Sequence, residues 1–248
     1  MTDKNIETHR YNKRARLLLD ANEFGNVHKV AACLNVLYEY YFKLLGLNVS
    51  DGSAFNLLEI GAGMGENTKP LIDMSYNVCA TDISPESVKV MDHRFSKYGN
   101  FSTEVADMEK LPFNNGSFDM VCSAGSLSYG DNIVVMNEVY RVLKQGGVFI
   151  VVDSLNNPIY RINRYIHYLR GNRSKSTLVR MPTTNLINRY DEKFGSVQVR
   201  FFGAITWLFP LLGKILSEHA LAKFSDWIDA RLKIKKSAFK FVMMAVKE

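Results

Sequence analysis

Short apolar runs recur along the first two thirds of the chain, and most are followed by glycine or a carboxylate. They span residues 57–60, 77–81, 118–123 and 148–152. Runs this short and this continuous are typical of strands that are buried on both faces of a parallel sheet. The stretches 66–74 and 133–143, which lie between them, can form helices. Strands that alternate with helices in this way predict an α/β fold.

Three glycines at alternate positions follow the first run. The segment reads L-L-E-I-G-A-G-M-G, with Glu59 ahead of Gly61, Gly63 and Gly65. A turn without side chains lets a bulky ligand lie against bare backbone. In the dinucleotide pattern G-x-G-x-x-G the third glycine comes one residue later, and the turn carries a diphosphate. Because Glu59 would repel an anion, the sequence favours a nucleoside that carries positive charge. A glycine turn without a ligand is the alternative.

An acidic residue, Asp82, ends the second run about 20 residues after the glycines. Many α/β proteins that bind nucleosides hold the two ribose hydroxyls with an acid at this place. A carboxylate offers two acceptor oxygens to those two donors. Ser84 and Pro85 then begin a helix. The alternative role of Asp82 is therefore that of a helix cap.

Four ordered segments between residues 55 and 153 resemble the motifs of class I S-adenosylmethionine-dependent methyltransferases, of the type 11-like group. Besides the glycine turn they include D-M-E-K-L-P-F, which begins at Asp107, and E-V-Y-R-V-L-K-Q-G-G-V-F-I. The resemblance implies a Rossmann-like sheet of seven mostly parallel strands, with helices on both faces and strand 7 antiparallel. We expect the last two strands at 197–201 and 237–246.

The same resemblance implies S-adenosylmethionine as the cofactor. It implies that Asp107 accepts a hydrogen bond from the adenine amino group and that Met108 lies against the adenine ring. The predicted cofactor-binding residues are Glu59, Gly61, Ala62, Gly63, Gly65, Asp82, Ile83, Asp107, Met108 and Ser123.

We expect a single methyltransferase domain over residues 1–248. Its predicted parts are a helical N-terminal arm (1–50), a cofactor-binding core (55–153), an inserted helical acceptor lid (154–193), and C-terminal strands with a helix (194–248). The insert follows the fifth strand, so it would lie over the ligand site at the carboxyl ends of the strands.

The insert begins with an amphipathic pattern. An apolar stripe at helical spacing consists of Ile159, Ile162, Ile166 and Leu169. Arginine and tyrosine fill most other positions, and these suit a sugar or a phosphate. A structural helix with a solvated basic face is the alternative. For the apolar stretch 201–216 we expect packing in the core, with membrane contact as the alternative.

Methyl transfer from a sulfonium needs an aligned acceptor, and a hydroxyl acceptor also needs a base. Many methyltransferases of this class place a histidine in the loop after the fourth strand, but residues 123–131 contain none. We name Tyr129 as a catalytic candidate for its place in that loop, and His167 because it titrates near neutral pH. No metal site is expected, since the three cysteines lack the spacing of metal ligands.

The segment N-P-I-Y-R-I-N-R-Y-I-H-Y-L-R-G resembles, more weakly, methyltransferases of bacterial surface-polysaccharide assembly. This implies O-methylation of a saccharide, nucleotide-linked or lipid-linked, in polysaccharide biosynthesis. Methylation of a quinone or another isoprenoid ring is the alternative that the stretch 201–216 favours. RNA methylation and cofactor binding without catalysis stay open. Nucleic acid is not the expected partner, because the sequence contains no recognised RNA module.

Charge is divided unevenly along the chain. Residues 1–153 carry 14 Lys and Arg against 19 Asp and Glu, a net charge of −5, whereas residues 154–248 carry 17 against 6, a net charge of +11. This asymmetry indicates an anionic partner or a solvated basic face. The charged N-terminus lacks the pattern of a signal peptide. We expect a cytoplasmic protein whose basic C-terminal part can contact the inner face of the membrane, and the sequence does not indicate an oligomeric state.

Overall fold

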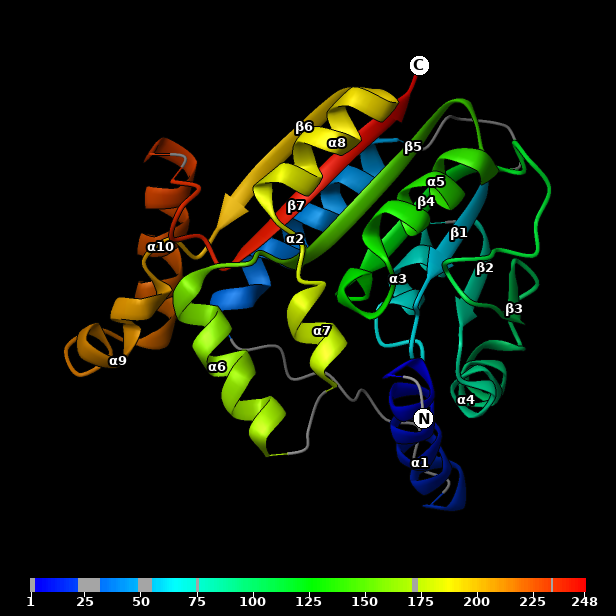
Figure 1. The fold of residues 1–248 in the computed structure, drawn as a ribbon, viewed down its shortest axis with the longest axis horizontal. Helices are drawn as coiled ribbons and strands as arrows, with labels where there is room; N and C mark the ends of the chain where they lie inside the picture. Colours follow the sequence, from blue (N-terminus) through cyan, green and yellow to red (C-terminus); the bar gives the residue numbers. More distant parts are fainter. Residues whose placement is uncertain (1–2, 22–31, 49–54, 75, 171–173, 233) are drawn as a thin grey trace.

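The computed structural model describes residues 3–21, 32–48, 55–74, 76–170, 174–232 and 234–248. Within these residues seven strands form one sheet in the order β3-β2-β1-β4-β5-β7-β6 (Figure 1). They are β1 (Asn56–Ile60), β2 (Asn77–Asp82), β3 (Phe101–Val105), β4 (Phe118–Ala124), β5 (Leu143–Ser154), β6 (Gly195–Phe202) and β7 (Lys240–Lys247). Only β7 runs antiparallel to its neighbours, β5 and β6. The predicted Rossmann-like sheet is confirmed.

Helices cover both faces of this sheet. The described helices are α1 (Asp3–Ala21), α2 (Ala32–Leu47), α3 (Thr68–Asp73), α4 (Pro85–Phe95), α5 (Asn132–Val142), α6 (Pro158–Leu169), α7 (Lys175–Val179), α8 (Thr184–Phe194), α9 (Phe209–Leu212) and α10 (Glu218–Leu232). Part of the predicted N-terminal arm, residues 22–31, lies outside the described residues.

Two apolar cores form, one on each face, because successive residues of a strand point to opposite sides. Leu58 and Phe149 belong to the core under α5 and α8. Their neighbours Leu57 and Ile150 belong to the core under α2, α3 and α4. A strand buried on both faces must be apolar at nearly every position. This explains the continuous runs in the sequence.

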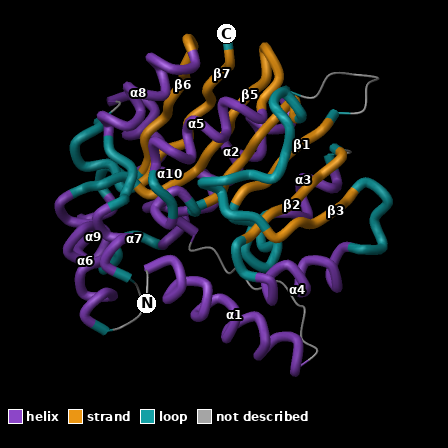
Figure 2. The backbone as a smooth tube through the Cα atoms, turned by 45° about the vertical axis from the view of Figure 1, so that its right-hand side comes forward, coloured by secondary structure: helices purple, strands orange, loops and turns teal. Residues whose placement is uncertain are grey.

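The carboxyl ends of β1, β2, β4 and β5 meet at one edge of the sheet. Helices α1, α6 and α7 lie beyond that edge (Figure 2). Helix α8, the last part of the predicted lid, packs on the sheet instead, with Leu186, Tyr190 and Phe194 buried in the core. Residues above the ligand edge therefore come from α1, α6 and α7.

The expectation that 201–216 packs in the core holds for its first residues and is wrong for the rest. Phe201 and Phe202 are buried at the end of β6, whereas Trp207, Leu211 and Ile215 are exposed. The chain leaves the sheet at Gly203, whose φ is 75°. Beyond it Leu208, Phe209 and Leu212 are half-buried, and only some of the apolar side chains, such as Leu211, are exposed.

Candidate active site

The glycine turn after β1 presents bare backbone at the ligand edge. Gly61 and Gly63 have φ of 64° and 61°, a left-handed conformation that glycine adopts without strain. A Cβ at Gly61 would lie 2.4 Å from Cβ of Ser126, so no side chain fits there. The N–H of Ala62 donates to the carbonyl of Thr81 at 2.9 Å, which fixes the turn against β2. A ligand can therefore approach this backbone closely.

Asp82 lies directly beneath this turn at the end of β2. Its Oδ2 accepts from the N–H of Gly63 at 2.9 Å, and its Oδ1 accepts from the N–H of Ser84 at 2.9 Å. Burial raises the pKa of Asp82 to about 6, against the lowering effect of these two hydrogen bonds. Ser84 itself caps α4 by accepting from the N–H of Ser87. The capping role considered for Asp82 therefore falls to Ser84.

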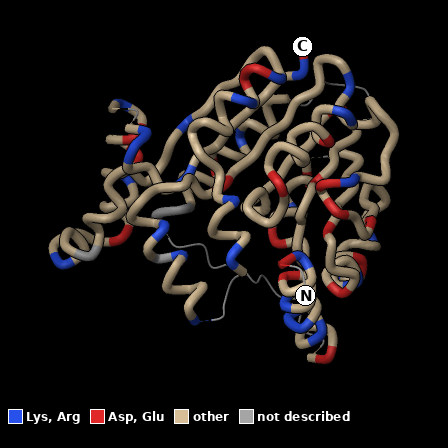
Figure 3. Tube along the Cα trace, viewed as in Figure 1, with Lys and Arg blue, Asp and Glu red and all other residues tan. Residues whose placement is uncertain are grey.

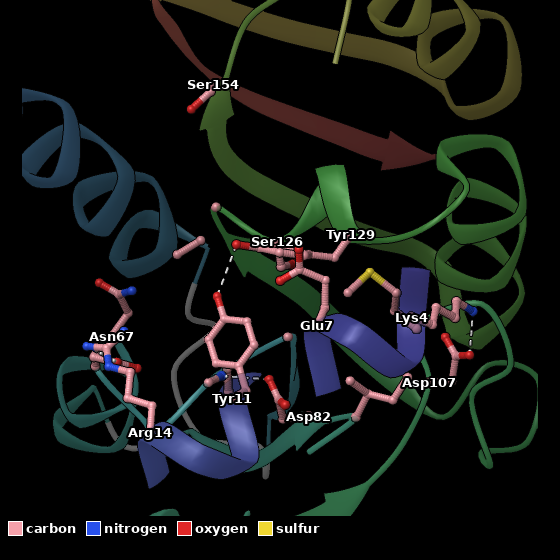
Figure 4. A pocket seen from close by; sticks show the side chains of 18 of the residues that line it. Lys4, Glu7, Tyr11, Arg14, Asn67, Asp82, Asp107, Ser126, Tyr129 and Ser154 are labelled. Carbon is pink, nitrogen blue, oxygen red and sulfur yellow. Dashed lines mark hydrogen bonds and ion pairs between the residues drawn. The ribbon is translucent and has the colours of Figure 1, made fainter. Parts of the chain in front are cut away.

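Helix α1 lies across the ends of β1, β2 and β3. Lys4 Nζ is 2.5 Å from Oδ2 of Asp107 and 2.7 Å from Oε2 of Glu109. Tyr11 points toward Tyr129, and the two hydroxyl oxygens are 3.0 Å apart (Figure 4). The helix thus covers this side of the edge through polar contacts.

A cavity of about 310 Å³ lies between α1 and the strand ends. The half under α1, which we call the acidic half, is lined by the carboxylates Glu7, Glu66, Asp82 and Asp107. Its two basic residues are partnered: Lys4 pairs with Asp107, and Arg14 lies 3.9 Å from Glu66. This half suits a ligand that brings positive charge.

The other half, which we call the basic half, lies beyond the end of β5. It is lined by Tyr38, Ser154, Tyr160, Arg164 and Lys240. The Arg164 guanidinium lies over the ring of Tyr160, 5.4 Å from its centroid. Burial alone would raise the pKa of Tyr160, but the charges of Arg164 and Lys240 outweigh it and lower the pKa. The two halves therefore differ in the sign of their charge.

Comparison with known proteins identifies the family that this geometry belongs to. Residues 58–151 match the family described as Methyltransferase domain. These residues form a class I S-adenosylmethionine-dependent methyltransferase domain. The predicted family is thereby confirmed for this segment, which carries the glycine turn, Asp82 and Asp107.

Curated relatives of the methyltransferase domain are similar over part of their length. Sterol 4-C-methyltransferase strm-1 of Caenorhabditis elegans is 32% identical over 115 residues, 45% of this chain and 34% of the relative. The ubiquinone/menaquinone biosynthesis C-methyltransferase UbiE of Geobacter sp. (strain M21) is 30% identical over 143 residues, 52% of this chain and 57% of the relative. The chain thus covers less than two thirds of each relative.

Solved structures share the fold of the methyltransferase domain. YcgJ of Bacillus subtilis superposes with a TM-score of 0.57 at 17% identity, over 85% of this chain and 99% of that one. Geranyl diphosphate C-methyltransferase of Streptomyces coelicolor A3(2) superposes with a TM-score of 0.57 at 15% identity, over 87% of this chain and 81% of that one. The fold predicted from the sequence agrees with both.

The structure brings most of the predicted residues of the methyltransferase domain to the cavity. Those that line it are Gly61, Ala62, Gly63, Asp82, Ile83, Asp107, Met108 and Tyr129. Three others lie behind its wall: Glu59, Gly65 and Ser123. A Cβ at Gly65 would lie 2.5 Å from Cε2 of Phe95, so Gly65 makes room for α4. Ser123 is fully buried, with its Oγ 2.5 Å from Oγ of Ser126.

Glu59 is 1% exposed and accepts a hydrogen bond from Oγ1 of Thr68 at 2.6 Å. Burial raises the pKa of Glu59 to about 8. Burial therefore favours the neutral, protonated form of this side chain. The repulsion of anions that the sequence suggested for Glu59 instead comes from the carboxylates that line the acidic half.

The structure does not bring the second catalytic candidate, His167, to the cavity. His167 is exposed on α6. It follows Tyr160 by seven residues, a rise of about 10 Å along the helix, and this carries it beyond the basic half. Tyr129 lies at the junction of the two halves and stays the candidate base.

Several of the residues that line the cavity were not predicted from the sequence as site residues, among them Lys4, Tyr38, Tyr160, Arg164 and Lys240. Tyr160 and Arg164 are four apart on the face of α6 opposite its apolar stripe, so a signal existed for them. Lys4, Tyr38 and Lys240 are distant in sequence from every motif and are brought in by the fold. Among the described residues no cluster of three metal-ligating side chains occurs.

Proposed function

We propose that the protein binds S-adenosylmethionine in the acidic half and transfers its methyl group to a small molecule held in the basic half. Asp82 beneath the glycine turn carries this proposal, because its carboxylate offers acceptors to a ribose diol. The sulfonium and ammonium groups of the cofactor match the surrounding carboxylates. Met108 and Ile83 offer an apolar wall for the adenine.

For the acceptor, we propose a ring that carries an apolar isoprenoid tail, the alternative considered from the sequence. The curated relatives are named for sterol and quinone methylation, and another is a 2-methyl-6-phytyl-1,4-hydroquinone methyltransferase of Synechocystis. The aromatic side chains of Tyr38 and Tyr160 can stack on a ring. The lipid-linked or nucleotide-linked saccharide is the second candidate, favoured by the two cations of the same half.

The acceptor must lose a proton during or after transfer, and two phenols of the cavity are placed to help. Tyr129 lies between the halves, and its hydroxyl contacts Tyr11 and Arg10. Tyr160 lies deeper in the basic half, where Arg164 and Lys240 favour its ionised form. We propose Tyr129 as the group that touches the reacting atom.

The test is a methyl-transfer assay with labelled S-adenosylmethionine on three acceptors: a prenylated hydroquinone, a sterol and a lipid-linked glycan. Turnover on the hydroquinone would support the first candidate. Tyr129→Phe should lower kcat by at least tenfold with an unchanged Kd for S-adenosylhomocysteine. Turnover on the glycan alone would select the second candidate. A folded protein that binds neither form of the cofactor would refute the methyltransferase proposal.

We further propose that the protein meets an anionic lipid surface next to this half. The apolar stripe of α6 is exposed at Ile159, Ile162, Ile166 and Leu169. On the same side of the molecule (Figures 1 and 2) α9 and α10 expose Leu211 and Trp227. Lysines and arginines lie among them (Figure 3). An exposed apolar face among basic residues is typical of helices that lie in a membrane interface. Within the described residues no helix has the length and hydrophobicity needed to cross a bilayer.

Sedimentation with phosphatidylglycerol-containing vesicles tests this surface. We expect Ile162→Asp to weaken vesicle binding at least tenfold, since inserting one isoleucine side chain is worth about 1.5–3 kcal/mol. Val134→Asp is the matched control, because Val134 is also exposed but lies on α5, over the opposite part of the sheet. Equal binding of both variants and the wild type would contradict the proposed surface.

A further inference from the structure

The basic half contains two cations that no carboxylate of the described chain neutralises at close range. Arg164 is only 5% exposed, and its Nε has no hydrogen-bond partner. Its Nη1 is 3.5 Å from Oγ of Ser128. Lys240 Nζ donates to Oγ of Ser154 at 3.4 Å. In the part of the chain that the structure describes, neither cation forms an ion pair within 4.0 Å, whereas Lys4 and Arg14 of the acidic half do.

One buried carboxylate lies near these cations, and its oxygens are already engaged. Asp153 is 1% exposed. Its Oδ2 accepts from the N–H of Leu127 at 2.9 Å, and its Oδ1 accepts from the N–H of Ser154 at 2.6 Å. Asp153 carries at most one negative charge and, in the described structure, forms no ion pair with either cation. Against the two positive charges of Arg164 and Lys240, the basic half therefore keeps an excess of positive charge.

Burying a cation without a close partner is costly unless a ligand supplies the opposite charge. Within the described residues, Arg164 and Lys240 lack a carboxylate partner, and Nε of Arg164 lacks a hydrogen-bond partner. We therefore propose that the basic half is a subsite for a phosphate or diphosphate group of the acceptor. A guanidinium fork takes two oxygens of such a group, and a third oxygen is left for the lysine. A carboxylate has only two oxygens, so it has no third oxygen for the lysine once the guanidinium fork has bound both.

The subsite lies on the acceptor side of the cavity. Ser154 is set apart from Asp82 and Asp107 (Figure 4), and Tyr129 lies between the two groups. This inference rests on the proposed methyl transfer. Of the two acceptor candidates, only the nucleotide-linked or lipid-linked saccharide presents a phosphoryl group, so the subsite favours that candidate over a plain prenylated hydroquinone.

Isothermal titration with inorganic pyrophosphate tests the subsite in protein saturated with S-adenosylhomocysteine. We expect the wild type to bind pyrophosphate, and we expect Arg164→Gln and Lys240→Gln each to weaken that binding at least tenfold. Arg161→Gln is the matched control, because it removes the same charge from an exposed position of α6 and should bind like the wild type.

The affinity for S-adenosylhomocysteine, measured on the same variants, separates the outcomes. Unchanged cofactor affinity shows that the variants fold and that the cofactor site on which the proposed function rests is intact, so a loss of pyrophosphate binding then concerns the subsite alone. Loss of cofactor affinity in Arg164→Gln with pyrophosphate binding intact would assign the cations to the cofactor carboxylate and overturn the subsite. Binding of benzoate as tight as that of pyrophosphate would overturn the phosphoryl specificity, as would absence of pyrophosphate binding in the wild type.

Discussion

Replacing Gly61 with alanine is expected to abolish detectable binding of S-adenosylhomocysteine and to lower the free energy of unfolding by about 2–4 kcal/mol. Gly61 has φ of 64°, where an L side chain is strained. The added Cβ would also lie 2.4 Å from Cβ and 2.6 Å from Oγ of Ser126. Ser126 is itself 4% exposed and bonded to Ser123, so it cannot withdraw. The turn must move, and it would lose its position over Asp82.

Titration calorimetry and chemical denaturation measure the two effects. Gly99→Ala is the matched control, since no atom lies within 4 Å of its added Cβ and its φ is not positive in the strained range. That variant should bind like the wild type and be at least as stable. If Gly61→Ala retained wild-type affinity, the cofactor would not lie against this turn.

Asp82→Asn should weaken binding of S-adenosylhomocysteine by about 100-fold at pH 7.5. Two hydrogen bonds from ribose hydroxyls to a carboxylate are together worth about 3 kcal/mol. Asparagine keeps one acceptor and turns an amide donor toward the N–H of Gly63 or Ser84, which are donors themselves. Ribose binding and the local turn therefore both suffer.

The pH dependence of wild-type binding follows from the pKa of Asp82, which burial raises to about 6. The ligand favours the ionised carboxylate, so affinity should be constant well above pH 6 and fall as the pH drops below it. The same raised pKa means that the folded, empty protein holds this proton more tightly than the unfolded chain. Its contribution to the free energy of unfolding therefore decreases as the pH rises from about 4 to 6.

Binding measured from pH 8 to pH 5 checks this dependence, and Asp82→Asn should lack the step near pH 6. Asp73→Asn serves as the control, because Asp73 is an exposed residue paired with Lys69 on α3. A flat wild-type profile together with wild-type affinity in Asp82→Asn would show that this carboxylate does not hold the ligand.

The parts of the site that local sequence encodes were predictable. A turn that needs three glycines and a carboxylate at the next strand end leave a readable pattern, and so does a strand buried on both faces. The orientation of α6 was harder to predict. Its stripe at Ile162 and Ile166 predicts an amphipathic helix, but helical spacing alone does not say that the side bearing Tyr160 and Arg164 is the one turned inward.

Contacts between segments that are distant in sequence could not be predicted, because they depend on how the elements pack. Lys240 reaches the cavity because β7 inserts antiparallel between β5 and β6 and pairs at Ser154. Lys4 reaches Asp107 because α1 crosses the strand ends. Neither position lies in a motif, and both depend on the assembled sheet.

Lys4 binds the carboxylate at the adenine side of the acidic half. Its ammonium lies 2.5 Å from Oδ2 of Asp107, the residue that the family resemblance assigns to the adenine amino group. A nucleoside that donates to this carboxylate must share it with Lys4 or displace it, so the first turn of α1 and the adenine amino group are expected to compete for Asp107.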